Sequence, residues 1–136
     1  MSDIVDRATR SRMMAGIKAK DTAPEMVVRR FLHSHGFRYR LHVKNLPGKP
    51  DIVLPKYRTA IFVHGCFWHQ HSRCKYAAMP NSNRPFWESK LGANRERDKQ
   101  DRKHLQKLGW KVLTIWECQL NEINLSALTE RIVADD

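Results

Sequence analysis

Residues 63–74, with the sequence VHGCFWHQHSRC, concentrate side chains that can bind metal or transfer protons. Three histidines, two cysteines, a Phe and a Trp fall within twelve positions. Imidazole and thiol groups at this density need partners that an apolar core does not offer. A solvated loop, in turn, would leave the Phe-Trp pair in water. The composition therefore points to metal binding, nuclease chemistry or base stacking, and the rest of the chain has to decide among them.

Metal binding is indicated by the spacing of the cysteines. Cys66, His71 and Cys74 follow the pattern C-x4-H-x2-C, which allows one short loop to turn several ligands toward one ion. Cys118 lies just past a predicted strand and would complete a Cys3His set, typical of a closed structural zinc site. Three is an odd number of cysteines, which argues against a disulfide framework. Free, partly buried thiols are the alternative, and His69 is a rival ligand.

Acid-base chemistry is open to the histidines that this set leaves over, His64 and His69, because imidazole titrates near neutral pH. Asp51 begins one strand of a predicted hairpin and His64 ends the other, so we expect them to lie close together. A strand-end carboxylate, with a backbone carbonyl, is a plausible Mg²⁺ site. The ion would bridge Asp51 and a phosphate oxygen. Taken singly, Asp51 after Pro50 is typical of a turn.

The helices and strands that must position these residues are predicted from the periodicity of apolar residues and from residues typical of helix ends. Residues 9–18 predict a short helix. A second helix is predicted from Thr22, which with Glu25 forms a capping-box pattern, to Gly36. Residues 84–109 predict a long helix, with a possible break at Gly92.

Strands are predicted at 37–43, 51–54, 59–65 and 110–117, and a last helix at 124–136. Residues 55–58 read as the turn of a hairpin. Trp110 and Trp116, in the last strand, are predicted to be core residues. The order of elements indicates one α/β or α+β domain over residues 1–136, with a mixed central sheet flanked by helices.

The charge predicts a polyanionic partner. The net charge is +11 and the pI about 10.0. Residues 1–111 carry +15 and residues 112–136 carry −4. Nucleic acid fits this excess better than an anionic membrane, because no helix pairs a basic face with a broad apolar one. Neither a membrane-spanning run nor a signal peptide is recognisable, so we expect a cytoplasmic setting.

Several motifs together resemble the very-short-patch-repair (Vsr) mismatch endonucleases: ATRSRMM, LPGKPDIV, IFVHGCFWH, NRERD and LGWKVLTIWEC. The resemblance covers nearly the whole chain, and HGCFWH with the downstream WEC is its most specific part. It implies a restriction-endonuclease-like core, related to the PD-(D/E)xK nucleases. It also implies Mg²⁺-dependent nicking 5′ to the thymine of T:G mismatches left by deaminated 5-methylcytosine, with a structural zinc.

The resemblance implies roles residue by residue. Asp51 and the Val63 backbone carbonyl would bind Mg²⁺, and His69 would be the general acid or base. The remaining active-site roles fall to His64, as a phosphate or water partner, to Asp98, which would orient a histidine, and to Glu25, which would position water. For Glu25 the capping role remains the alternative. The zinc set would be Cys66, His71, Cys74 and Cys118.

Aromatic residues add a possible DNA contact. By the resemblance, Phe67, Trp68 and Trp87 would wedge between base pairs beside the mismatch, where opening the stack is least costly. Their alternative is a core position, which adjacency argues against for Phe67-Trp68. Further positions matched to DNA contacts, each with packing or solvated surface as its alternative, are Lys90, Asn94, Met14 and Ile17.

We therefore expect a Mg²⁺-dependent, zinc-containing mismatch-nicking endonuclease acting on double-stranded DNA. The alternatives are a non-catalytic zinc-containing DNA-binding module and a restriction-type nuclease without mismatch preference. Residues 1–20 would form a DNA-contacting helix or arm. We expect a monomer associated with the nucleoid, and a MutL-type repair protein is a candidate partner.

Overall fold

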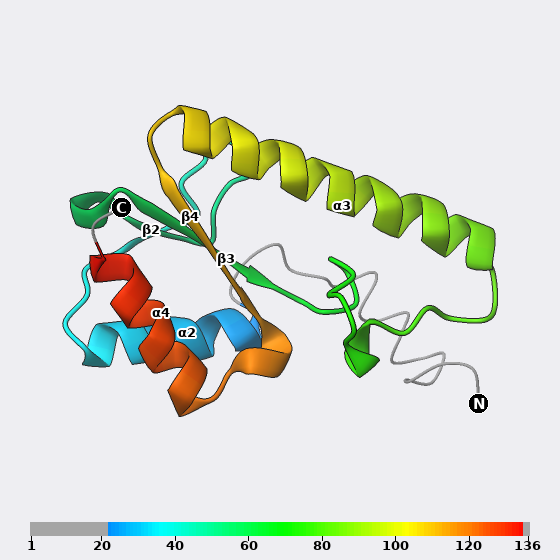
Figure 1. Ribbon diagram of the computed structural model, residues 1–136, viewed down its shortest axis with the longest axis horizontal. Helices are drawn as coiled ribbons and strands as arrows, with labels where there is room; N and C mark the ends of the chain where they lie inside the picture. The colour runs from blue at the N-terminus through cyan, green and yellow to red at the C-terminus, as the bar shows by residue number, and fades with distance from the viewer. Residues whose placement is uncertain (1–21, 135–136) are drawn as a thin grey trace.

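The computed structural model describes residues 22–134, which form helices around one sheet (Figure 1). The helices are α2 (Ala23–Ser34), α3 (Arg84–Lys107) and α4 (Glu122–Val133). The strands are β1 (Arg40–Leu41), β2 (Ile52–Leu54), β3 (Thr59–His64) and β4 (Lys111–Trp116). Short 3-10 turns are η1 (Pro55–Tyr57), η2 (Lys75–Ala77) and η3 (Glu117–Gln119). The predicted helix 9–18, with Met14 and Ile17, and the predicted arm 1–20 lie outside these residues.

The sheet has the order β1-β2-β3-β4. The first two pairings are antiparallel, and β3 and β4 run parallel with His64 opposite Trp116. Because parallel strands end at the same edge of a sheet, the loop after β3 and the turn η3 after β4 begin side by side. This edge gathers most of the chemically active residues of the described chain.

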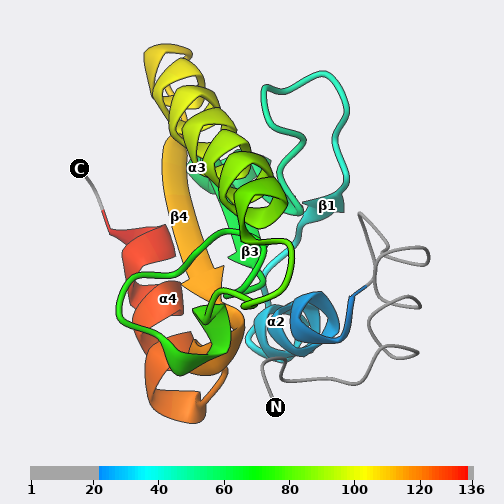
Figure 2. The same cartoon turned by 90° about the vertical axis from the view of Figure 1, so that its right-hand side faces the viewer.

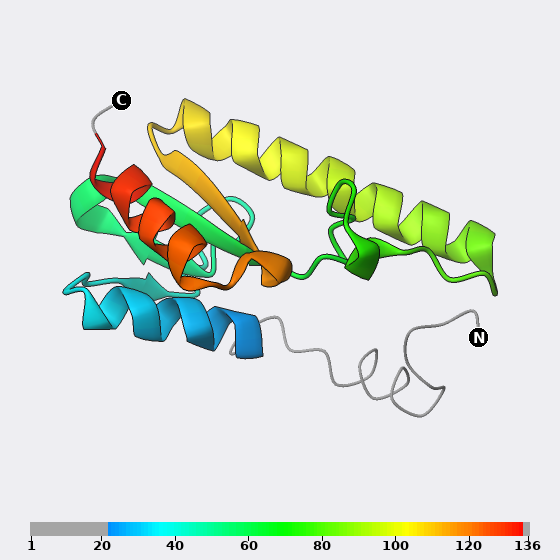
Figure 3. The ribbon, with the colours of Figure 1, turned by 60° about the horizontal axis from the view of Figure 1, so that its bottom comes forward.

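The sheet lies between two helical layers. Helix α3 runs along one face, and α2 and α4 cover the other (Figures 1 and 3). The core lies under α2 and α4, where Leu113 and Ile115 of β4 meet β2 and β3. Figure 2 shows that the loop after β3, in green, lies beside the beginning of α3.

The predicted mixed α/β fold is confirmed, and so is the second helix. The Thr22 Oγ1 accepts a hydrogen bond from the Glu25 amide at 3.3 Å, and Gly36 ends the helix with a φ of +83°. The predicted hairpin forms through η1, and Arg58 takes a left-handed conformation with a φ of +49°. In the described residues no helix is long and apolar enough to cross a membrane.

Two predictions about elements, and one about the burial of two Trp residues, are wrong. The strand expected over 37–43 is only Arg40–Leu41, because it pairs with a three-residue strand on one side alone. Helix α3 is unbroken at Gly92. One exposed Gly costs a helix only about 0.5–1 kcal/mol, less than the buried Trp87, Leu91 and Leu105 contribute by packing.

Trp110 and Trp116 are half-buried rather than core residues, which is the third error. Because β4 is an edge strand, only its alternate residues Leu113 and Ile115 enter the core. The ring of Trp110 instead lies under the guanidinium of Arg58, 4.6 Å from the ring centroid.

Candidate active site and metal centre

The loop after β3 is wound tightly, so its side chains point in different directions. The amides of His69 and His71 donate to the carbonyls of Gly65 and Cys66, at 3.1 and 3.0 Å. The Gln70 side chain donates to the Phe67 carbonyl at 2.7 Å and spans the loop. Neighbouring residues of one short segment thereby enter a cysteine cluster, a histidine cluster and a group of aromatic rings.

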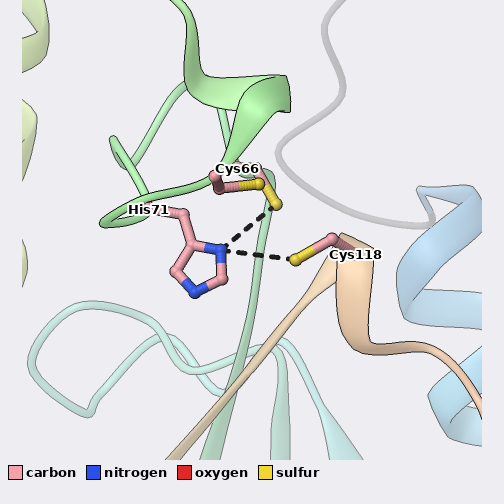
Figure 4. Close-up of side chains that lie close together, drawn as sticks. Cys66, His71 and Cys118 are labelled. Atoms are coloured by element: carbon pink, nitrogen blue, oxygen red, sulfur yellow. Dashed lines mark hydrogen bonds between the residues drawn. The ribbon is translucent and has the colours of Figure 1, made fainter.

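The first cluster consists of Cys66, His71, Cys74 and Cys118, whose ligand atoms all lie within 4.8 Å of one another. His71 Nδ1 lies 3.7 Å from Cys66 Sγ and 3.3 Å from Cys118 Sγ (Figure 4). A tetrahedral zinc ion with ordinary bond lengths would separate sulfur and nitrogen ligands by about 3.6 Å. The predicted Cys3His set is therefore brought together, and His69 belongs to another cluster.

The cysteine cluster offers the ligand set of a cation site, with free thiols as the alternative. Cys66 is fully buried, and burial raises the pKa of its thiol to about 12. Thiolates in such surroundings need a positive charge beside them, which Zn²⁺ supplies. The Cys66 amide also donates to Glu117 Oε1 at 2.9 Å, which ties the loop to the end of β4. Sequence reasoning missed Glu117, although it directly precedes Cys118.

We expect Cys118→Ser to behave as a folding variant. Removing one ligand opens the tetrahedron and releases a connection between segments about fifty residues apart, so zinc content and melting temperature should fall together. Native mass spectrometry and thermal unfolding measure both. Ser72→Ala, an exposed change in the same loop, should alter neither. A metal-free, stably folded parent protein would show that the cysteines are only thiols.

The second cluster consists of His64, His69 and Asp98. His69 Nδ1 lies 2.5 Å from Asp98 Oδ2, and the rings of His64 and His69 stack with centroids 3.7 Å apart. Asp98 fixes the tautomer of His69 with Nδ1 protonated, which leaves Nε2 for a substrate. Burial, and to a smaller extent the adjacent His69, lower the pKa of His64 to about 3, so His64 is neutral.

Trp116 separates the two clusters. The ring of His71 stacks on its indole with centroids 4.1 Å apart, while the His64 ring meets it edge-on at 5.2 Å. One side chain therefore contacts both a candidate zinc ligand and the stacked histidines. Its position at the end of β4, opposite His64, gives it this role in place of the predicted core role.

The third cluster consists of Glu25, His42 and Asp51. The Val63 amide donates to Asp51 Oδ2 at 2.8 Å, so Asp51 lies against the strand end that carries His64. Burial raises the pKa of Asp51 to about 6; the Val63 N–H bond lowers it and the nearby Glu25 raises it. A divalent cation would offset the cost of ionising this half-buried carboxylate, so the cluster fits such an ion.

Glu25 takes part in the helix cap through its amide and in the third cluster through its carboxylate. Its amide completes the bond to Thr22, but its carboxylate, 1 % exposed, points away from the cap. Glu25 Oε2 lies 3.1 Å from Arg29 Nη1 and 3.2 Å from His42 Nε2. Sequence reasoning missed His42 because the alternating pattern assigned it to a strand.

Aromatic rings from the loop and α3 form a fourth group. The Phe67 ring lies 5.1 Å from Trp68 and 5.4 Å from Trp87, and Phe86, which the sequence did not single out, stacks on Trp87 at 5.0 Å. Phe67 and Trp68 are half-buried and Trp87 is 5 % exposed. The Asn94 amide donates to the Trp68 carbonyl at 3.2 Å. Lys90 is exposed, one turn earlier on α3.

Comparison of the sequence with known proteins identifies the family of the chain. The profile described as DNA mismatch endonuclease Vsr matches residues 2–75. The type II nicking enzyme V.NmeAIP of Neisseria meningitidis serogroup A is 47% identical over 132 residues, which cover 97% of this chain and 92% of that protein. The DNA mismatch endonuclease Vsr of Escherichia coli K12 is 44% identical over 135 residues, covering 97% and 86%. The type II nicking enzyme V.XorIIP of Xanthomonas oryzae is 44% identical over 132 residues, covering 97% and 95%.

The chain is strongly basic, and it places carboxylates and a His-Asp pair near one edge of its sheet. Together with these relatives, this site defines a DNA-cleaving hydrolase. The chain belongs to the DNA mismatch endonuclease Vsr family. The family resemblance predicted from the motifs is thereby confirmed.

Proposed function

We propose that this protein nicks DNA 5′ to the thymine of T:G mismatches that arise from deaminated 5-methylcytosine. The observation that carries the proposal is one continuous path of contacts. Asp51 bonds to Val63, the next residue His64 stacks on His69, and His69 directly follows Trp68 of the aromatic group. Groups for metal binding, proton transfer and base stacking therefore adjoin one another.

Asp51 and the backbone carbonyl of Val63 would hold a Mg²⁺ ion. The ion, when bound, supplies a Lewis acid for a phosphate oxygen. The buried carboxylate of Glu25 and the half-buried carboxylate of Asp51 support a site for a hard divalent cation. Glu25, fixed by Arg29, would position water at this site. The Cys3His cluster would hold zinc in a structural role, since all four of its positions are protein ligands.

Hydrolysis joins a water oxygen to phosphorus and breaks one phosphorus–oxygen ester bond, so one proton must leave the water and one must reach the departing oxygen. His69 is the residue for this transfer, because Asp98 occupies Nδ1 and leaves Nε2 for substrate. His64 is kept neutral by burial, and so would serve as a hydrogen-bonding partner of phosphate or water rather than as a cation.

The aromatic group would read the mismatch by unstacking. Phe67 and Trp68 are half-buried, while the buried Trp87 contacts both rings from α3. Inserting a wedge costs a few kcal/mol per base step, and less at a weakly stacked T:G pair. Asn94 orders the Trp68 backbone, and exposed Lys90 would reach bases or phosphate. Met14 and Ile17 remain candidates for the minor groove.

Trp68→Ala should reduce affinity for T:G duplex more than for fully paired duplex. Base stacking contributes about 1–3 kcal/mol, so the loss on the mismatch should be roughly 5- to 150-fold, with melting temperature and zinc content retained. Binding titrations with both duplexes measure the difference. Trp110→Ala removes a half-buried indole elsewhere and should not discriminate between the duplexes. An equal loss on both from a folded Trp68→Ala protein would contradict a mismatch wedge.

The decisive experiment is cleavage of a labelled duplex with T:G or C:G at one position, with and without Mg²⁺. Nicking of the T:G duplex alone, and only with Mg²⁺, is expected. Binding without cleavage would favour a non-catalytic DNA-binding module, and equal cleavage of both duplexes a restriction-type nuclease.

Further features of the proposal rest on the family and the fold. The mixed sheet between helices is compatible with a restriction-endonuclease-like core. We propose a monomer acting on chromosomal DNA in the cytoplasm. Recruitment by a MutL-type protein is part of the same proposal.

A further inference from the structure

We propose that His42 supplies a nitrogen ligand to the divalent ion at Asp51, so that the site binds Mn²⁺ in preference to Mg²⁺. This inference rests on the metal site of the proposed function. It goes beyond that site by adding a ligand of a different chemical type and a resulting choice of metal.

The backbone places His42 beside Asp51. Strand β1 ends at Leu41, opposite Ile52, and the next amide, that of His42, donates to the Asp51 carbonyl at 3.4 Å. His42 has a left-handed φ of +51°, which is uncommon for a residue with a side chain and recurs at functional sites. The strand thus ends with an imidazole turned toward two carboxylates.

The distances in this cluster suit ligands of one ion. One atom each of Glu25, His42 and Asp51 lies within 4.8 Å of the others, and His42 Nε2 is 3.2 Å from Glu25 Oε2. Neighbouring ligands of an octahedral ion with bonds of 2.0–2.1 Å lie about 3.0 Å apart. A small inward movement of the side chains would therefore enclose an ion without rearranging the backbone.

The charges also favour an ion at this position. Glu25 is 1 % exposed and has Arg29 at 3.1 Å, while Asp51 accepts from one backbone amide. The buried carboxylate of Glu25 and the half-buried carboxylate of Asp51 lie close together, so a cation between them would lower the cost of keeping both ionised. A neutral imidazole can join as a ligand without adding charge.

The nitrogen ligand determines which metal is favoured. Mg²⁺ prefers oxygen ligands and retains its water, whereas first-row transition ions accept imidazole more readily. With two carboxylates and one His, the cluster offers a mixed set to which Mn²⁺ is better suited than Mg²⁺. Glu25 would then have a second function beside positioning water, since it faces the same ion.

The test uses the full chain with its cysteine cluster loaded with zinc, without DNA. Mn²⁺ binding is followed by the EPR signal of the free ion, with Mg²⁺ as competitor. Pulsed EPR then detects the ¹⁴N nucleus of an imidazole bound to Mn²⁺. We expect tighter binding of Mn²⁺ than of Mg²⁺, and a ¹⁴N modulation that changes when the histidines are labelled with ¹⁵N.

His42→Gln should abolish the ¹⁴N modulation and weaken Mn²⁺ binding by about 10-fold or more, as for other changes around a metal. Its effect on Mg²⁺ should be smaller, because the amide oxygen of Gln can still serve as a ligand. His33→Gln, an exposed change on α2, is the matched control and should alter neither. His69→Gln tests the second histidine cluster and should leave the modulation intact.

The outcomes separate this inference from the function on which it rests. Loss of Mn²⁺ binding in Asp51→Asn, with binding and modulation unchanged in His42→Gln, would overturn the role of His42 and leave the metal site. Unchanged Mn²⁺ binding in Asp51→Asn would overturn the metal site itself. Absence of ¹⁴N modulation from the unmodified protein would reject nitrogen ligation, whether or not any variant folds.

Discussion

Asp51→Asn is expected to abolish nicking of a T:G duplex while DNA binding is retained or strengthened. The substitution removes the carboxylate charge that a Mg²⁺ ion needs, and it also removes a negative charge that repels phosphate. Burial raises the pKa of Asp51 to about 6, so the ionised carboxylate is costly in the metal-free fold at neutral pH. A neutral amide avoids this cost, and the melting temperature of the metal-free variant should not fall.

Single-turnover cleavage, duplex binding and thermal unfolding on one preparation test this expectation. Glu130→Gln changes the net charge equally at an exposed site on α4 and should leave nicking intact. Normal nicking by Asp51→Asn at low Mg²⁺ would rule out Asp51 as the metal ligand. Lost cleavage accompanied by a lower melting temperature would instead indicate a structural defect.

The second large effect is expected from His69→Ala, which should lower the nicking rate by about 10²–10⁴-fold, the range for a lost general acid or base. The fold and zinc content should persist, because His69 pairs with Asp98 and lies outside the cysteine cluster. Asp98→Asn should cause a smaller loss, since it disturbs the orientation of His69 without removing the ring. Pre-steady-state cleavage at saturating enzyme measures both.

His33→Ala provides the matched histidine control, because His33 is exposed near the end of α2. If His69→Ala loses zinc and unfolds while His71→Ala does neither, the two histidines have exchanged their assigned roles.

Short-range patterns in the sequence were sufficient to predict many of the residues that the structure brings together in the candidate site. The spacing of Cys66, His71 and Cys74 selected three members of the cysteine cluster, and the position of Cys118 after a strand selected the fourth. The hairpin placed Asp51 beside the end of β3, although its bond is to Val63 rather than to His64. Such predictions succeed because short loops and strand pairing restrict where a side chain can lie.

What the sequence did not reveal depends on contacts between distant segments. His42 and Glu25 meet only when β1 and α2 have both packed against the sheet. Glu117 binds Cys66 across the parallel strands, and the edge position of β4 leaves Trp116 half-buried. Propensity carries no information about these tertiary relations, so periodicity assigned His42 to a strand and Trp116 to the core.

The continuity of α3 through Gly92 has a mechanical consequence. Trp87, Asn94 and Asp98 are spaced by seven and four residues, which puts them on one side of the helix, about 16 Å from first to last. One end of the helix thus supports the rings proposed to contact the bases, and a point further along it holds His69, the proposed proton-transfer residue. Because the helix is continuous from Trp87 to Asp98, a displacement of the rings would be expected to move Asp98 as well. In the proposed function, recognition of the mismatch and cleavage would therefore be mechanically coupled through this helix.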